Sequence, residues 1–233
     1  MIMTVAHASS TWIRETLVVF GKDVAIERST GEIVATSGLF AALVTVLASL
    51  AFSTTGQGPR AAAGVIWLAV AFSAVLATSR SWQREREESA LAGLVLSPAA
   101  RSAIYVGKAA GALVFVAAIE LIVLPCSALL LDIDLVRHAG PLLVVSVLAD
   151  VGIAAVGTLF GAMTVRTRAR DLVLASVVLP LLAPTLGSAI AATRELLDGA
   201  SLVELGDYLE LMLVFDVVFA AAGVWLFGLL VED

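Results

Sequence analysis

The sequence predicts an all-α integral membrane protein with six transmembrane helices. Of its 233 residues, 60% are hydrophobic and only 15% are charged, whereas soluble domains are nearer half apolar and a quarter charged. The mean hydropathy is +1.02. The apolar residues are gathered in runs of about 20 or more, the length that a helix needs to cross the hydrocarbon of a bilayer. Composition and run length therefore disfavour a soluble globular enzyme.

Ahead of the first span, residues 1–32 are predicted to form a cytoplasmic arm that contains an amphipathic helix. Ile13, Leu17, Phe20 and Val24 recur at i, i+4, i+7 and i+11, and most charged residues of the arm fall elsewhere on the helical wheel. This pattern is typical of a helix that lies in the membrane interface. An ordinary amphipathic helix packed on other protein is the alternative.

The membrane domain is predicted to cover residues 33–231. Each of its six apolar segments is long enough to span a bilayer as a helix. These segments are residues 33–52, 61–78, 104–131, 141–165, 172–192 and 209–231. Together they take up well over half of the chain, which leaves no room for a soluble catalytic domain.

The distribution of basic residues predicts that both termini are cytoplasmic. Eleven of the fourteen Lys and Arg residues lie in the N-terminal arm, around the connection after the second span, and in the connection after the fourth. The other three, Arg60, Arg137 and Arg194, lie singly in the alternate loops, which are acidic. Basic residues are retained on the cytoplasmic side, and an even number of spans agrees with termini on the same side.

Between the second and third spans, residues 79–103 are more structured than a plain loop. The mixed charges around residues 84–88 can pair across i, i+4 and predict a water-facing helix. Ser97 and Pro98 fit an N-cap and a first helical residue that open the third span. Leucines between these features would suit a docking surface for a soluble partner, although a charge run is commonly just a solvated face. The candidate docking residues are Arg84, Glu85, Glu87, Leu91, Leu94, Ser97, Pro98 and Arg101.

Three carboxylates lie inside predicted spans: Glu120, Asp150 and Asp216. Each would cost roughly 2.5–3.5 kcal/mol at the centre of a bilayer, so they should face the bundle or a wet cavity open to the outside. They could form a proton relay or line a polar substrate pathway. Alternatively, they are protonated carboxyl groups that hydrogen-bond between helices.

Prolines and glycines are expected to shape the bundle. Pro125 in the third span, and Pro180 and Pro184 in the fifth, each remove a backbone donor and should kink their helices. The pairs Gly107 with Gly111 and Gly157 with Gly161 have the GxxxG spacing that lets helices approach closely.

The chain carries no motif for chemistry of its own. It contains no phosphate-binding loop, covalent haem motif, zinc motif or nucleophile elbow, so we expect no metal and no cofactor bound by this chain. Its single cysteine excludes a disulfide scaffold. His138 in an external loop is either a haem ligand or a bystander. The net charge of -6 argues against nucleic acid as a partner.

Several local strings together resemble the CcmB family of the cytochrome c maturation system, also called haem exporter protein B. They are Lys22-Asp23 with Glu27-Arg28, Gly64-x-x-Trp67, Arg84-Glu85, LAGLVLSP at 91–98, Arg101, Gly107-Lys108, GIAAVGTL at 152–159, the basic loop 166–171, and Pro180 with Pro184. The resemblance covers roughly residues 18–231 in order. Its most specific parts are the region from Glu85 to the Leu-Ser-Pro of residues 96–98 and the span with Pro180 and Pro184.

The resemblance implies a non-catalytic subunit of ABC-2-type permease architecture in the bacterial cytoplasmic (inner) membrane. Such a subunit would pair with a separate ATPase, CcmA, and work with CcmC, CcmD and the haem chaperone CcmE. ATP hydrolysis would then drive haem delivery and release of the haem-loaded chaperone, with haem and ATP handled by the complex. In this family the stretch from Arg84 to Arg101 resembles the cytoplasmic coupling element that receives motion from the ATPase.

Two other functions remain open from the sequence. The first is a generic ABC-2-type exporter of a hydrophobic or lipid-like substrate, with the same architecture and another cargo. The second is a proton-coupled secondary transporter that uses Glu120, Asp150 and Asp216. The two halves of the chain show no internal repeat, which weighs against the second.

Overall fold

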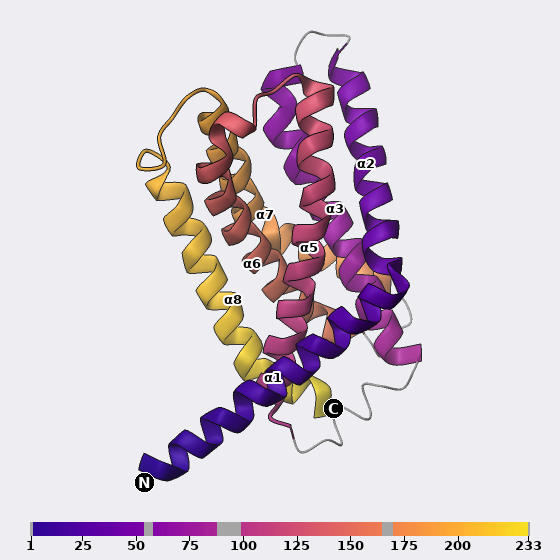
Figure 1. Ribbon diagram of the computed structural model, residues 1–233, viewed down its shortest axis with the longest axis vertical. Coiled ribbons are helices and arrows are strands. Elements are labelled where there is room, and N and C mark those ends of the chain that lie inside the picture. Colours follow the sequence, from indigo (N-terminus) through magenta and orange to yellow (C-terminus); the bar gives the residue numbers. More distant parts are fainter. Residues whose placement is uncertain (1, 54–57, 88–98, 165–169, 233) are drawn as a thin grey trace.

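The computed structural model describes residues 2–53, 58–87, 99–164 and 170–232, and these residues are helical apart from short connections (Figure 1). The elements in chain order are α1 (Ile2–Thr30), α2 (Glu32–Ser53), α3 (Gly58–Glu87), α5 (Arg101–Leu131), the 3-10 helix η1 (Val136–His138), α6 (Ala139–Thr164), α7 (Arg170–Leu197) and α8 (Gly206–Glu232). The predicted all-α class is confirmed.

Six helices are long and apolar enough to cross a membrane, namely α2, α3, α5, α6, α7 and α8. The predicted count of six spans is therefore confirmed. The helix of the second span is longer than its apolar run, because α3 continues through the mixed-charge residues to Glu87. Figure 1 shows both termini at the same end of the bundle, as an even number of spans requires. Which side of the membrane that end faces stays a prediction.

The inner helices α3 and α6 approach each other closely through small residues. A Cβ atom built on Gly157 would lie 3.0 Å from the Thr78 hydroxyl oxygen. One built on Gly161 would lie only 2.3 Å from the indole ring of Trp82. The GxxxG spacing in α6 thus does what the sequence predicts, since it admits side chains of α3 against the backbone.

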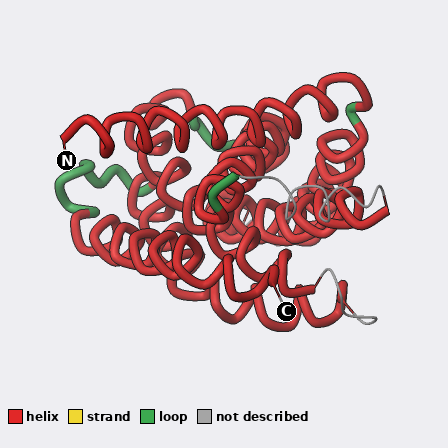
Figure 2. The backbone as a smooth tube through the Cα atoms, turned by 90° about the horizontal axis from the view of Figure 1, so that it is seen from below, coloured by secondary structure: helices red, strands yellow, loops and turns green. Residues whose placement is uncertain are grey.

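Helix α1 is not part of the bundle of spans but runs obliquely across its lower end and packs on α5 (Figures 1 and 2). Its inward face carries the buried residues Val19, Asp23 and Glu27. Its outward face carries the apolar residues Ile13 and Leu17, whose exposed fractions are 53% and 59%. Exposed apolar side chains on the outward face of a helix suit the predicted position against lipid. That position itself stays a prediction.

Candidate functional site

Charged side chains of α1, α3 and α5 meet where α1 packs on the bundle. We call Lys22, Asp23, Glu85 and Lys108 the Lys108 cluster. Lys108 of α5 is buried, with its Nζ 2.9 Å from Oδ2 of Asp23 and 2.5 Å from Oε1 of Glu85. Lys22 of α1 donates to the same oxygen of Glu85. Lys108, Asp23 and Glu85 are buried, whereas 32% of the Lys22 side chain is exposed. The buried charges are tolerable only because each has a partner.

The aromatic ring of Trp82 adds to the environment of Lys108. The Lys108 Nζ lies 5.3 Å from the centroid of that ring, within the range of a cation–π contact. Trp82 is the same side chain that contacts Gly161 of α6. The cluster therefore joins α1, α3 and α5 directly and reaches α6 through one indole.

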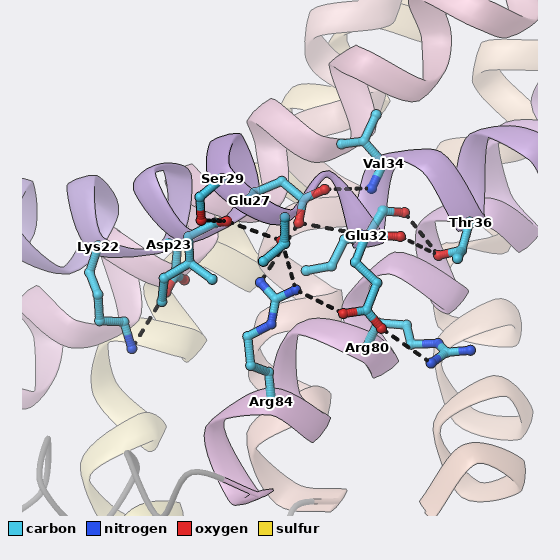
Figure 3. A network of polar contacts seen from close by, with 12 residues as sticks. Lys22, Asp23, Glu27, Ser29, Glu32, Val34, Thr36, Arg80 and Arg84 are labelled. Atoms are coloured by element: carbon cyan, nitrogen blue, oxygen red, sulfur yellow. Dashed lines mark hydrogen bonds and ion pairs between the residues drawn. The ribbon is translucent and has the colours of Figure 1, made fainter.

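A second group of charges lies next to the first where α1 meets α2, and Figure 3 shows its members. The Arg84 guanidinium lies 3.7 Å from Oε2 of Glu27 and 3.4 Å from Oε2 of Glu32. Arg80, one helical turn earlier, lies 3.8 Å from Oε1 of Glu32. These side chains tie the charged end of α3 to the connection between α1 and α2.

Glu27 also caps the N-terminus of α2. Its carboxylate accepts hydrogen bonds from the backbone N–H groups of Ile33 at 3.2 Å and Val34 at 2.8 Å. A carboxylate at a helix N-terminus satisfies free donors and suits the helix dipole. Gly31 makes the turn between the helices with a φ of 62°, a conformation that favours glycine. The exit of α1 is therefore fixed to the start of the first span.

Near its other end, α1 is bonded to the start of α5. The carboxylate of Glu15 accepts from the backbone N–H of Ala100 at 3.0 Å, and the indole N–H of Trp12 donates to the Ser102 hydroxyl at 2.9 Å. Glu85, bonded to Lys22, precedes residues 88–98, and Ala100 follows them. Helix α1 is thus attached to the chain on both sides of residues 88–98, at two points inside the predicted coupling segment 79–103.

Two glycines of α5 let α1 come this close. A Cβ atom on Gly107 would lie 2.7 Å from Cβ of Val19 and 2.8 Å from the backbone oxygen of Thr16. A Cβ atom on Gly111 would lie 3.4 Å from Asp23. The predicted close approach at this glycine pair is confirmed, and its partner is the N-terminal helix.

The predicted docking residues are only partly within the described structure. Arg84 and Glu85 are paired within the chain, as above, and Arg101 is half-buried at the start of α5. The predicted opening of the third span at Ser97 and Pro98 is wrong, because α5 begins at Arg101 with Ala100 as its N-cap. The side chain of Glu87, and Leu91, Leu94, Ser97 and Pro98, lie outside the described residues. Their role in docking therefore stays a prediction.

Sequence reasoning did not place Lys22, Asp23, Glu27 and Lys108 in a site. One signal was available, because a lysine inside an apolar span needs an anionic partner. Lys108 follows Gly107 at the start of the third span. Which carboxylates pair with it depends on tertiary packing.

The three intramembrane carboxylates are buried within the bundle, as the cost of placing them in lipid predicts. Glu120 of α5 and Asp150 of α6 interact with each other. Asp216 of α8 lies against α6, where a Cβ atom on Gly152 would be 2.6 Å from its Oδ1. None of the three lines the cavity of about 830 Å³ at the end of the bundle away from the termini. Their function stays a prediction.

The prolines lie inside the helices where they were expected, Pro125 in α5 and Pro180 and Pro184 in α7, and both helices continue past them. The predicted kinks stay predictions.

His138 ends η1, with its Nδ1 3.1 Å from the backbone oxygen of Asp134. Because a carbonyl oxygen only accepts, this contact is a hydrogen bond when Nδ1 carries a proton, and Nε2 is the ring nitrogen that does not take part in it. Whether that nitrogen binds anything stays a prediction.

In a comparison with protein families, the family model described as CcmB protein matches residues 14–229. The match includes most of α1 and reaches the last turn of α8. A search of curated proteins found no match.

Proposed function

This chain belongs to the CcmB family, and on that premise we propose that it couples ATP hydrolysis on a separate ATPase to haem delivery and release of a haem-loaded chaperone. The family consists of membrane permease subunits of ABC-type complexes that serve haem export and cytochrome c maturation with an ATPase partner. The chain is accordingly a multi-pass membrane protein. We assign it no catalysis of its own, and we place it in the bacterial inner membrane with CcmA, CcmC, CcmD and CcmE as partners.

In this proposal residues 1–32 form a cytoplasmic arm, residues 33–231 the membrane domain, and residues 79–103 the coupling segment within it. The observation that supports coupling is the attachment of α1 on both sides of residues 88–98, through Glu85 and through Ala100. A push on this segment would therefore move α1 as well.

The Lys108 cluster would carry that movement into the spans. Separating α1 from α5 breaks the Lys108–Asp23 and Lys22–Glu85 pairs and leaves Lys108 and Glu85 with only each other, which is costly for buried charges. Shifting α1, α3 and α5 together avoids that cost. Closure of the ATPase would then tilt the second and third spans as one unit and change the surface offered to membrane and periplasmic partners.

Co-purification with the ATPase tests the docking surface. We expect Leu94→Arg to abolish recovery of the ATPase, because a charge replaces an apolar contact at the proposed interface. Leu202→Arg is the matched control, since Leu202 is an exposed leucine in the connection at the opposite end of the bundle. Equal recovery of the ATPase with both variants would overturn the proposed docking surface.

Reversing the charge at Glu85 is expected to affect the position of α1 as well as docking of the ATPase. Glu85 is buried between Lys22 and Lys108, so Glu85→Lys should release α1 as well as weaken docking. Glu85→Gln keeps the shape and one acceptor, and we expect it to retain more of the ATPase. Size-exclusion profiles in detergent would separate loss of docking from loss of folding.

The cellular role is tested by staining haem on gels of membranes from a strain that lacks this gene. We expect loss of all cytochromes with covalently attached haem, restored by a complementing copy. An unchanged profile would discard the maturation role, whatever the docking experiment gives.

A further inference from the structure

The end of the bundle away from the termini holds a cavity of about 830 Å³. Its walls come from the start of α3, the connection between α5 and α6, and the end of α7. These elements lie side by side at the top of Figure 1. A volume of this size is in the range of sites for small organic molecules.

All three basic residues of this end converge on the cavity. Arg60, Arg137 and Arg194 lie far apart in the sequence, and each is an exposed lining residue. Basic residues are disfavoured in the loops that the charge count assigns to the outside. The positive-inside rule concerns the orientation of the protein in the membrane, and it does not explain why these three arginines line one cavity.

The three guanidinium groups are free to bind a ligand. Among the described residues, none of them has a carboxylate within 4.0 Å. Each guanidinium offers a planar set of donors that matches a carboxylate with two parallel hydrogen bonds. Three such groups on three separate elements suit a ligand whose carboxylates are spread over its frame.

The rest of the lining narrows the class of ligand. Asp132, Asp134 and Asp198 also line the cavity, so its net charge is near zero and binding depends on hydrogen bonds to the individual guanidinium groups more than on a net positive field. Ala61, Ile133 and Leu197 supply apolar surface for a carbon frame. We propose that this cavity binds a small organic polycarboxylate through the guanidinium groups of Arg60, Arg137 and Arg194.

Binding of radiolabelled citrate to the full chain tests this site, with the protein in phosphatidylcholine nanodiscs at constant ionic strength. We expect saturable binding that Arg137→Gln weakens about tenfold, which corresponds to about 1.4 kcal/mol. The triple variant of Arg60, Arg137 and Arg194 to Gln should abolish it. Arg14→Gln, at the opposite end of the molecule, is the matched control and should bind like the unaltered chain.

A gain of affinity supplies a second readout. Asp198→Asn removes a negative charge from the lining, so we expect it to tighten citrate binding several-fold, which a folding defect would not do. Absence of saturable binding, or equal binding by the triple variant, would overturn the proposal.

Anionic lipid headgroups share the oxyanion chemistry of the ligand. If added phosphatidylglycerol displaces citrate, a lipid occupies the site and the assignment to a small solute is overturned. If citrate binding is unaffected, that assignment is supported. The assay contains no ATPase, so its outcome is independent of the coupling role.

Discussion

Lys108 carries a full positive charge on an apolar helix, and only 2% of its side chain is exposed. Its partners come from two other helices, so no local sequence rule places them. Asp23 lies 85 positions earlier and Glu85 lies 23 positions earlier. The sequence alone shows that the charge needs compensation, whereas the identity of the compensating groups follows from how α1 docks.

Replacing Lys108 by Met removes the positive charge and keeps the side-chain length. Asp23 and Glu85 then remain buried with only Lys22 near them, so we expect a loss of about 3–5 kcal/mol of stability. Thermal unfolding in detergent measures it. Adding Glu85→Gln should recover part of the loss, with a coupling energy of roughly 0.5–3 kcal/mol. Strictly additive effects would show that the two side chains do not interact.

Trp67 and Thr193 form a buried hydrogen bond between α3 and α7. The indole N–H donates to the Thr193 hydroxyl at 2.8 Å, and both residues are at most 1% exposed. Thr193→Val leaves that N–H without an acceptor, and we expect a loss of about 1–3 kcal/mol. Thr193→Ser keeps the hydroxyl and is the control. The same thermal assay compares them, and an equal loss in both variants would contradict a role for the hydrogen bond.

At the scale of elements, apolar run length was enough to predict six helices and their order. Hydropathy alone did not predict where the helices end. α3 continues through Arg84 to Glu87 because alternating charges can remain helical in water. The position of α1 could not be predicted from its own pattern, since the same amphipathic face suits lipid or protein. Packing decided that its charged face turns inward.

The docking of α1 depends on Gly107, and Gly107→Ala tests it. The added methyl group would overlap Val19 and the backbone of Thr16, so α1 should lift from α5 at a cost of about 1–3 kcal/mol. Trypsin cleavage within α1 should then speed up roughly 5- to 150-fold if it follows local opening. Gly187→Ala, where a methyl group meets nothing within 4 Å, should leave the cleavage rate unchanged. Equal rates in both variants would argue that α1 is not held by this contact.

At the scale of the whole molecule, the two ends of the bundle differ in how their charges are organised. At the end with the termini, Lys22, Lys108, Arg80 and Arg84 are paired with carboxylates and link helices to one another. At the other end, Arg60, Arg137 and Arg194 line an open cavity. The positive-inside count assigned these two groups of residues to opposite sides, but it could not foresee that one group forms ion pairs and the other surrounds a cavity.

The orientation itself can be measured with single cysteines in a background in which Cys126, the one native cysteine, is replaced by Ala. Val203 is 89% exposed in the connection between α7 and α8, and Ser29 is exposed at the end of α1. In intact cells with a permeable outer membrane, a membrane-impermeant maleimide should label Val203→Cys, because the charge count places that loop outside. Ser29→Cys should react only after the inner membrane is opened. The reverse labelling pattern would show that the molecule has the opposite orientation in the membrane. The α1 end would then lie on the side opposite the ATPase, where the proposed coupling could not operate.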